Sequence, residues 1–308
     1  MSADVAPARA AALRVDERVR EWRRHLHAHP ELGFAETATA DYVAGVLEGL
    51  GWEVARGIGG TGVVGTLKRG PGTEAIGLRA ELDALAIDEP SGRPHGSCNP
   101  GVMHACGHDG HLAMVLGAAA VLAEEGGFDG TLRVVFQPAE EHGRGAQAML
   151  DDAVLQRFPV DAMFGLHLIP GLPAGALHTR PGAIMAAEDD FEIRIVGQGG
   201  HSSRPQAVID PLVTAAEIVL ALQTVVARSL DPMESAVLSC TELVTDGIRN
   251  AIPGEVVVRG DTRSFASGTS ALLESRIRAI VDGVCAAHGA RGEVTYTRAG
   301  NRSPLALS

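Results

Sequence analysis

The chain has 308 residues, enough for more than one domain with a large buried core. It is 45% hydrophobic and its net charge is −12, which argues against nucleic acid or an anionic membrane as a partner. Residues 2–13 lack the apolar core of a signal peptide, and no apolar run approaches the roughly 18 residues of a membrane span. Four scattered cysteines without a disulfide spacing indicate reduced thiols, so we expect a cytoplasmic protein.

The first part of the chain alternates helices and strands. Helical patterns cover residues 15–29 and 37–50. An apolar helix is expected at 112–123, and strands are expected at 62–67, 75–78, 131–136 and 162–166. This alternation predicts an α/β domain built on a mostly parallel sheet that helices cover on both faces.

The pattern changes near Ala186. Strands are expected at 191–196, 236–244, 255–261 and 293–297, and helices at 211–228 and 270–288. The order βαββαβ is typical of a ferredoxin-like unit. We therefore predict a catalytic domain at 1–186, an inserted ferredoxin-like small domain at 187–296, and a remnant of the catalytic domain at 297–308.

The stretch 103–111, Met-His-Ala-Cys-Gly-His-Asp-Gly-His, is the densest group of metal-ligand types in the chain. Thiolate and imidazole are preferred ligands of zinc-like ions. Cys106 and His108 are two residues apart, so they can converge only in an irregular loop, which Gly107 permits. Asp109 is expected to cap the following helix. The alternative is an inert cysteine among solvated histidines.

Other candidates follow the ends of predicted strands, where ligands gather in open α/β sheets. Asp83 follows one strand, Glu140 and Glu141 follow another, and His167 ends a third. Asp83 is suited to hold a ligand imidazole by its second N–H. The histidines of the first helical region are interpreted as structural or solvated. The acidic pair Asp88–Glu89 is interpreted as solvated loop charges.

Glu140 and Glu141 form the most informative pair. In an extended loop, neighbouring side chains point in opposite directions, so one carboxylate can bind metal while the other acts as a base. The alternative interpretation of the pair is a solvated acidic turn.

Together these residues resemble the amidohydrolase branch of the two-metal aminoacylase/carboxypeptidase family of metallopeptidases. Hippurate hydrolases, N-acyl-amino-acid amidohydrolases and auxin-conjugate hydrolases belong to that branch. The resemblance extends from about His25 to Tyr296, and its matching stretches are residues 27–34, 59–62, 103–111, 137–141, 165–167, 199–201 and 250–253.

The resemblance implies two divalent ions per subunit, Mn or Zn with Co or Ni as alternatives. It implies metal ligands at Cys106, His108, Glu141 and His167, with the thiolate bridging the ions, and it implies Glu140 as general base and acid. In the small domain, which acts as lid and dimerisation surface, His201 would polarise the scissile carbonyl across a homodimer. Asn250 would contact the substrate carboxylate.

Two features depart from the family pattern. The usual Arg-Ala-Asp-Met-Asp is Arg-Ala-Glu-Leu-Asp here, which replaces an aspartate by Glu81 but keeps Asp83. Family members also supply a last histidine ligand after the lid, whereas the last histidine of this chain, His288, lies in a predicted lid helix. We therefore expect the second ion to bind weakly and activity to be reduced.

The leading interpretation is a metal-dependent amidohydrolase that cleaves N-acyl amino acids or related conjugates with water. The alternative is a truncated member of the family that binds metal and dimerises with little or no turnover. A structural zinc protein is disfavoured because Glu140 would then have no role.

Overall fold

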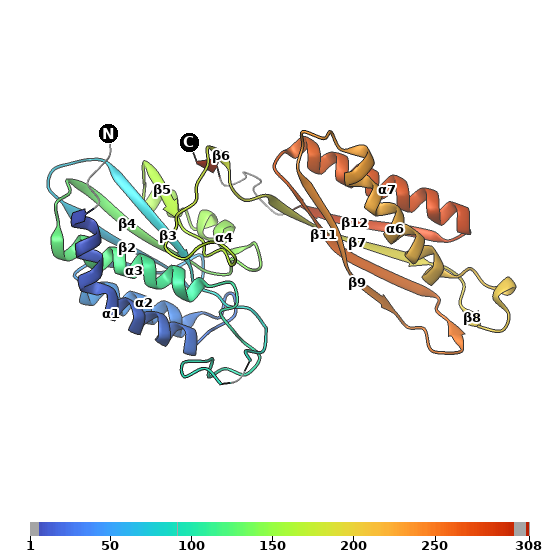
Figure 1. Ribbon diagram of the computed structural model, residues 1–308, viewed down its shortest axis with the longest axis horizontal. Coiled ribbons are helices and arrows are strands. Elements are labelled where there is room, and N and C mark those ends of the chain that lie inside the picture. The colour runs from blue at the N-terminus through green and yellow to red at the C-terminus, as the bar shows by residue number, and fades with distance from the viewer. Residues whose placement is uncertain (1–5, 91, 299–305, 308) are drawn as a thin grey trace. The chain divides into compact units, whose positions relative to one another are not determined.

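The computed structural model describes residues 6–90, 92–298 and 306–307, which fall into two compact units (Figure 1). The first unit covers Met1–Ala174 and the second Gly175–Ser308. The boundary precedes the predicted one, and each unit is described by itself.

The first unit contains one five-stranded sheet with strand order β1-β2-β4-β3-β5. Its strands are β1 (Glu53–Ile58), β2 (Gly62–Arg69), β3 (Ala75–Glu81), β4 (Gly130–Gln137) and β5 (Ala162–Gly165). Its helices are α1 (Ala6–Ala28), α2 (Thr37–Gly49), α3 (His108–Glu125), α4 (Gly145–Asp151) and α5 (Val154–Arg157).

The sheet is mixed, which corrects the expectation of a mostly parallel one. β3 pairs in parallel with β4 and β5, but β2 is antiparallel to both β1 and β4. The unpredicted strand β1 explains part of this difference. It turns into β2 through Gly59 and Gly60, both with positive φ, and so short a connection can only join antiparallel strands.

Helices cover both faces of this sheet, as predicted. Along β4, Val134 and Val135 point to opposite faces because side chains alternate along a strand. Val134 joins the core with Leu47 of α2 and Leu116 of α3, and Figure 1 shows α1, α2 and α3 together on this side. Val135 packs in a smaller cluster that includes Met149 of α4.

The second unit is a four-stranded antiparallel sheet with order β12-β7-β11-β9. Its main elements follow the predicted βαββαβ order: β7 (Ala187–Val196), α6 (Pro211–Ser229), β9 (Ala236–Thr245), β11 (Glu255–Ser264), α7 (Ser267–His288) and β12 (Arg291–Arg298). Two short pairs accompany them, β8 (Gly200–His201) with β10 (Ala251–Ile252) and β6 (Gly182–Ala183) with β13 (Ala306–Leu307). A 3-10 turn, η1, covers Pro205–Ala207.

Both long helices pack on one face of this sheet. Ile218 and Leu222 of α6 and Ile277 of α7 are fully buried against Ile193 and Val258 of the sheet. Of the described helices, α6 is the one long and apolar enough to cross a membrane by length and composition, which corrects the expectation that no run approaches that length. Its buried residues belong to the core of the second unit.

Candidate metal centre

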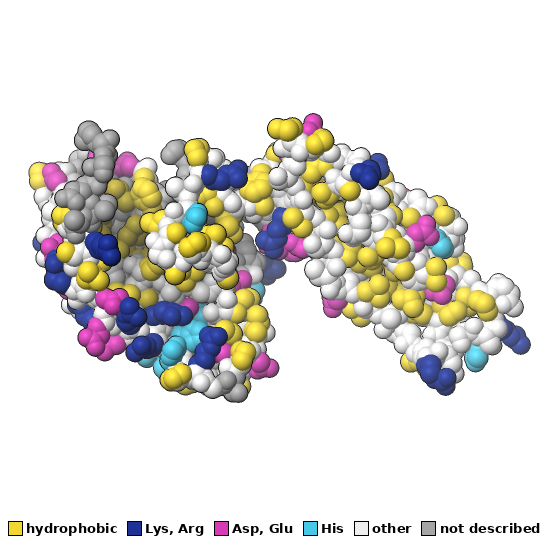
Figure 2. Space-filling model, in the orientation of Figure 1, with side chains coloured by type: hydrophobic (Ala, Val, Ile, Leu, Met, Phe, Trp, Pro, Cys, Tyr) yellow, Lys and Arg dark blue, Asp and Glu magenta, His cyan; other side chains and the backbone are white. Residues whose placement is uncertain are grey.

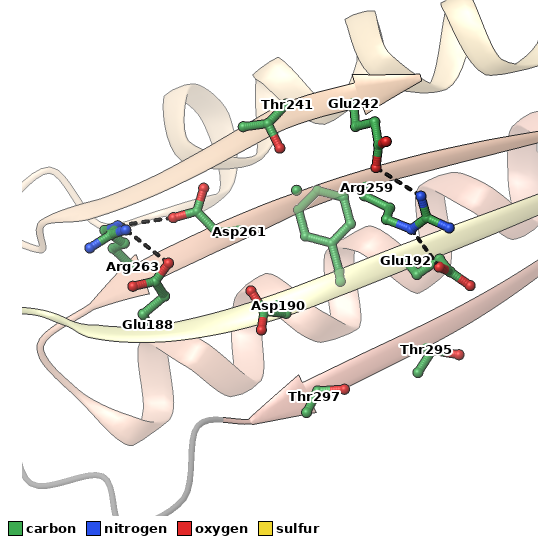
Figure 3. Close-up of a pocket in the computed structure, with 12 residues that line it drawn as sticks. Glu188, Asp190, Glu192, Thr241, Glu242, Arg259, Asp261, Arg263, Thr295 and Thr297 are labelled. Atoms are coloured by element: carbon green, nitrogen blue, oxygen red, sulfur yellow. Dashed lines mark hydrogen bonds and ion pairs between the residues drawn. The ribbon is translucent and has the colours of Figure 1, made fainter. Parts of the chain in front are cut away.

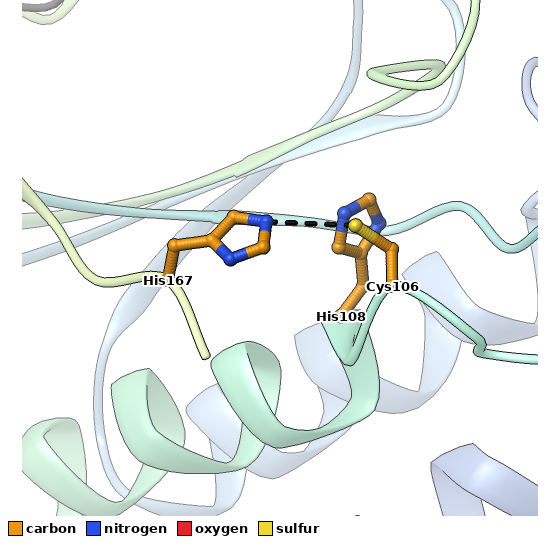
Figure 4. Close-up of side chains that lie close together, drawn as sticks. All are labelled: Cys106, His108 and His167. Atoms are coloured by element: carbon orange, nitrogen blue, oxygen red, sulfur yellow. Dashed lines mark hydrogen bonds between the residues drawn. The ribbon is translucent and has the colours of Figure 1, made fainter. Parts of the chain in front are cut away.

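The proposed metal ligands of the first unit come together beside the start of α3 (Figure 4). Cys106 Sγ lies 3.5 Å from His167 Nε2, and both lie close enough to His108 for one ion to contact all three side chains. His108, Glu140 and Glu141 form a second such group. His108 Nε2 is 3.8 Å from one carboxylate oxygen of each glutamate. His108 therefore belongs to both groups, and also to a third that it forms with Glu81 and His111.

Gly107 allows the turn that brings Cys106 and His108 together. It adopts φ 87° immediately before α3, a left-handed conformation that costs glycine little. α3 begins at His108, with Gly107 as its N-cap residue. Asp109 is therefore not the cap, which corrects that prediction. Its carboxylate instead accepts hydrogen bonds from His27 Nδ1 at 2.9 Å and Arg23 Nε at 3.0 Å.

Asp83 supports this centre through two separate contacts. Its main-chain oxygen accepts a hydrogen bond from His108 Nδ1 at 2.8 Å, which directs Nε2 toward the glutamates. Its carboxylate accepts the Glu141 N–H at 2.9 Å. Burial by itself raises the pKa of Asp83, but the hydrogen bonds from His108 and from the backbone of Glu141 and Glu140 lower it overall. Asp83 is therefore an anion that orients both neighbours.

Glu140 and Glu141 lie in a turn after β4 rather than in an extended loop, so both carboxylates approach His108 instead of diverging. The Glu141 side chain is 19% exposed and that of Glu140 is 40% exposed. Burial raises the pKa of Glu141, assisted by the charge of Glu140. The two carboxylates therefore differ in environment, although they do not point in opposite directions.

The turn before Glu140 depends on a glutamate that the sequence analysis did not single out. Ala139, with φ 45°, is one of the few non-glycine residues in the left-handed region among those described. Its N–H donates to Glu36 Oε1 at 2.7 Å, and Glu36 Oε2 accepts from the Thr61 hydroxyl at 2.7 Å. Glu36 is fully buried, and its position two residues after the matching stretch 27–34 is the one signal that could have drawn attention to it.

The other histidines near the centre have different environments. His111 is hydrogen-bonded through both ring nitrogens, and His104 is buried. Burial lowers the pKa of His104 to about 4. His27 and Glu89 are not solvated, because their side chains are 4% and 6% exposed and lie 3.0 Å apart. That finding corrects the interpretation of Glu89 as a solvated loop charge.

The residues at this centre fit a divalent cation. Among the described residues, His108 Nε2 and Glu141 Oε1 are buried without a hydrogen-bond partner, so both are free to bind an ion. Burial alone would lower the pKa of His108, but Asp83, Cys106 and Glu81 raise it to about 11. Negative groups thus favour a cation, and the thiolate, imidazole and carboxylate set suits Zn²⁺ or Mn²⁺.

His201 and Asn250 lie in the second unit, where the structure brings them together. Ala251, which follows Asn250, pairs with His201, and the Ser202 N–H donates to the Asn250 carbonyl at 3.1 Å. His201 is exposed, and its Nδ1 lies 2.9 Å from the Ser203 hydroxyl. His288, the last histidine of the chain, lies in α7 and contacts Glu217 at 2.6 Å.

The second unit also has an open hollow on the face of its sheet that carries no helix (Figure 3). Its charged side chains pair with one another. Arg259 contacts Glu192 and Glu242, and Arg263 contacts Asp261 and Glu188, all at 2.7 to 2.9 Å. None of the residues predicted for the site lines it. The cluster around His108 is therefore the better candidate for chemistry.

Comparison with known proteins decides the family of the chain. Residues 77–296 match Peptidase family M20/M25/M40. The chain belongs to this family. It is 41% identical over 266 residues to a hippurate hydrolase of Campylobacter jejuni, covering 86% of this chain and 69% of that protein. It is 40% identical over 278 residues to an N-acyl-L-amino acid amidohydrolase of Geobacillus stearothermophilus, covering 89% and 74%.

A solved relative adds information on the metal. The structure of the YXEP protein of Bacillus subtilis, described as a dinuclear metal-binding peptidase from the M20 family, matches with a TM-score of 0.74 and 34% identity. The match covers 94% of this chain and 74% of that one. The chain is accordingly a metal-dependent amidohydrolase, and enzymes of the M20 family are dinuclear.

Proposed function

We propose that this M20 amidohydrolase cleaves the amide bond of N-acyl amino acids or related hippurate-like conjugates. Cys106, His108, Glu141 and His167 hold the metal, and Glu140 is the general base. The observation that carries this proposal is the convergence of four such side chains on His108. Both His108 and Glu141 have a buried atom without a protein partner among the described residues.

The different exposure of the two glutamates supports their roles. Glu141 is the more buried, and its unpartnered Oε1 suits a ligand. Glu140 is more open to solvent, yet its Oε2 is 3.8 Å from His108 Nε2. It can therefore reach both water and a bound substrate, as a general base must.

The chemistry divides between the ion and the protein side chains. When bound, a divalent ion polarises the amide carbonyl and lowers the pKa of water. Glu140 takes a proton from the water whose oxygen bonds to the carbonyl carbon. It then delivers that proton to the amide nitrogen as the C–N bond breaks. Carboxylic acid and free amine are the products.

The second unit supplies the other proposed roles, as a ferredoxin-like lid and dimerisation domain. His201 polarises the carbonyl oxygen across a homodimer, and Asn250 binds the substrate carboxylate. Exposed apolar side chains support an interface on this unit: Leu220 on α6 is 71% exposed, and Leu243 and Val244 lie on the edge strand β9. Figure 2 shows hydrophobic side chains gathered over this unit. We further propose a cytoplasmic location, given the reduced cysteines.

The test combines metal analysis with turnover of a hippurate-type substrate. We expect Glu140→Gln to keep its metal and lose about 10² to 10⁴ in kcat, because only proton transfer is removed. Unlike Glu140→Gln, the variants Cys106→Ala and Glu141→Gln should lose metal, as measured by elemental analysis after dialysis. Glu242→Gln, which changes a carboxylate of the second unit, is the matched control and should alter neither quantity.

Three results would count against parts of this proposal. Near-normal kcat in Glu140→Gln would place the base elsewhere. Unchanged metal content in Cys106→Ala would remove that residue from the ligand set. Stoichiometric metal without turnover of any N-acyl amino acid would favour a chain that binds metal and dimerises but has little activity.

A further inference from the structure

His111 is a buried histidine that the proposed mechanism does not use. It lies one turn into α3, is 1% exposed, and is hydrogen-bonded through both ring nitrogens. Its Nε2 accepts the main-chain N–H of Leu168 at 2.9 Å. Because Nε2 accepts, the ring proton is on Nδ1, which donates to Glu81 Oε2 at 2.8 Å.

Glu81 is itself held firmly at the end of β3. It is 3% exposed and paired with Arg79, whose guanidinium also donates to Gln137 Oε1 of β4 at 2.6 and 3.0 Å. Burial alone would raise the pKa of Glu81, but the hydrogen bond from His111 and the charge of Arg79 lower it overall. A continuous set of polar contacts therefore runs from the centre of the sheet to Leu168.

Leu168 directly follows the proposed ligand His167. The His167 side chain is hydrogen-bonded through Nδ1 to the Leu168 carbonyl at 2.8 Å, so its orientation depends on where Leu168 lies. The rings of His111 and His167 also meet edge to face, with centroids 4.7 Å apart. β5, which leads into this segment, has four exposed residues and, among the described strands, pairs with β3 alone. Sheet pairing alone therefore holds the segment weakly.

We infer that His111, supported by Glu81, is a positioning residue that fixes the segment carrying His167, so that His167 Nε2 faces Cys106 and the metal. This inference rests on the proposed metal site. Glu81, His108 and His111 could themselves be considered as an ion site, since their ligand atoms lie close together. Both nitrogens of His111 are already engaged, however, so binding an ion there would break the contact to Leu168.

The test is Co²⁺ titration followed by visible absorption, which reports ligand geometry and thiolate coordination without any need for turnover. His111→Phe keeps the ring volume but removes both hydrogen bonds. We expect it to weaken Co²⁺ binding about 10- to 100-fold, the usual effect of losing a group that orients a ligand, and to change the ligand-field spectrum toward that of His167→Ala.

Two amide variants provide a rescue test. Both are expected to fold. The longer side chain of His111→Gln can place its carbonyl oxygen where Nε2 accepts the Leu168 N–H, whereas His111→Asn is too short. Gln should therefore restore most of the affinity and the spectrum, and Asn should not. His288→Phe breaks another histidine–glutamate pair, with Glu217 of the second unit, and should leave Co²⁺ binding unchanged.

The outcomes separate this inference from the proposed function. If the unaltered chain shows no thiolate–Co²⁺ absorption, the metal site itself is wrong and the inference fails with it. If the unaltered chain binds Co²⁺ and His111→Phe binds it equally well with the same spectrum, only the inference is overturned. Equal Co²⁺ affinities for the Gln and Asn variants would also overturn it. The proposal requires a hydrogen-bond acceptor at the place of His111 Nε2, and a polar side chain elsewhere should not suffice.

Discussion

Asp83 shows how one residue can contact two proposed metal ligands at once. Its main-chain carbonyl accepts a hydrogen bond from His108 Nδ1, and its carboxylate accepts one from the Glu141 N–H. One residue therefore orients two proposed ligands. The carboxylate also adds negative charge 3.5 Å from the His108 ring. The sequence analysis predicted the partnership with a ligand imidazole, but not the second contact.

Replacing Asp83 with Asn should separate geometry from charge. The amide oxygen can still accept the Glu141 N–H and the main chain still receives His108, so the fold should persist. Metal affinity should fall about 10- to 100-fold, because the anion that favours a cation is lost. Competition with a fluorescent chelator measures this, with Asp190→Asn in the second unit as the control. Affinity equal to that of the unaltered chain would show that the Asp83 charge has no role.

At the scale of elements, the N-terminal turn of α3 depends on α1 and on the loop that contains Glu89. His27 of α1 lies between two carboxylates, contacting Asp109 of α3 at 2.9 Å and Glu89 at 3.0 Å. All three side chains are at most 6% exposed. Glu89 Oε2 also accepts the Ser97 N–H at 2.6 Å. Three segments far apart in the sequence therefore meet beside the metal loop.

Glu89→Gln should destabilise the protein in a pH-dependent way. Hydrogen bonds from Ser97 and His27 lower the pKa of Glu89 in the folded state, so its contribution is present above the pKa of the unfolded chain, about 4.3. That contribution disappears as the pH falls through the lower folded pKa. We expect a loss of about 1 to 2 kcal/mol at pH 7 that shrinks toward zero in acid.

Denaturant unfolding at several pH values measures this difference between Glu89→Gln and the unaltered chain. Asp88→Asn changes the neighbouring exposed carboxylate and is the matched control, with no pH-dependent difference expected. A loss that stays constant down to the acid limit would mean that the shape of the side chain, and not its charge, stabilises the loop.

Much of the secondary structure could be predicted because it depends on local patterns. The apolar runs of β4 and α3 and the βαββαβ order followed from periodicity alone. Strand β1 could not be predicted, because its burial pattern is mostly exposed and intermediate and lacks an apolar face. The mixed direction of the sheet was missed as well, because β2 runs antiparallel to β4 as well as to β1.

The candidate site divides in the same way. Its ligands belong to dense motifs or follow strand ends, so chemistry and topology together predicted their convergence. Glu36, Glu81 and Glu89 were missed or misread because each has at least one partner 25 to 103 residues away along the chain. A single sequence contains no local signal for such pairings. The residues that support the ligands are therefore harder to predict than the ligands.

At the scale of the whole molecule, the residues proposed for catalysis are divided between the two units. Glu140 and the metal ligands belong to the first unit, and His201 and Asn250 to the second. If His201 acts across a homodimer, neither chain of a dimer contains a complete site by itself. A dimer contact through the exposed apolar side chains of α6 and β9 would then be needed for catalysis as well as for assembly. Dissociation of the dimer would separate His201 from the site that it completes.

Mixing two inactive chains tests this arrangement directly. Glu140→Gln lacks the base but keeps His201, and His201→Ala has the opposite defect, so each should be nearly inactive alone. After unfolding and joint refolding at equal amounts, half of the dimers pair one chain of each kind and contain one intact site of two. Hydrolysis of an N-acyl amino acid should therefore recover to about a quarter of that of the unaltered chain in a two-fold symmetric dimer.

Mixing the intact dimers without refolding is the control and should recover nothing until subunits exchange. If the co-refolded mixture stays as inactive as its parts while native mass spectrometry shows mixed dimers, His201 acts within its own chain or has no part in the reaction.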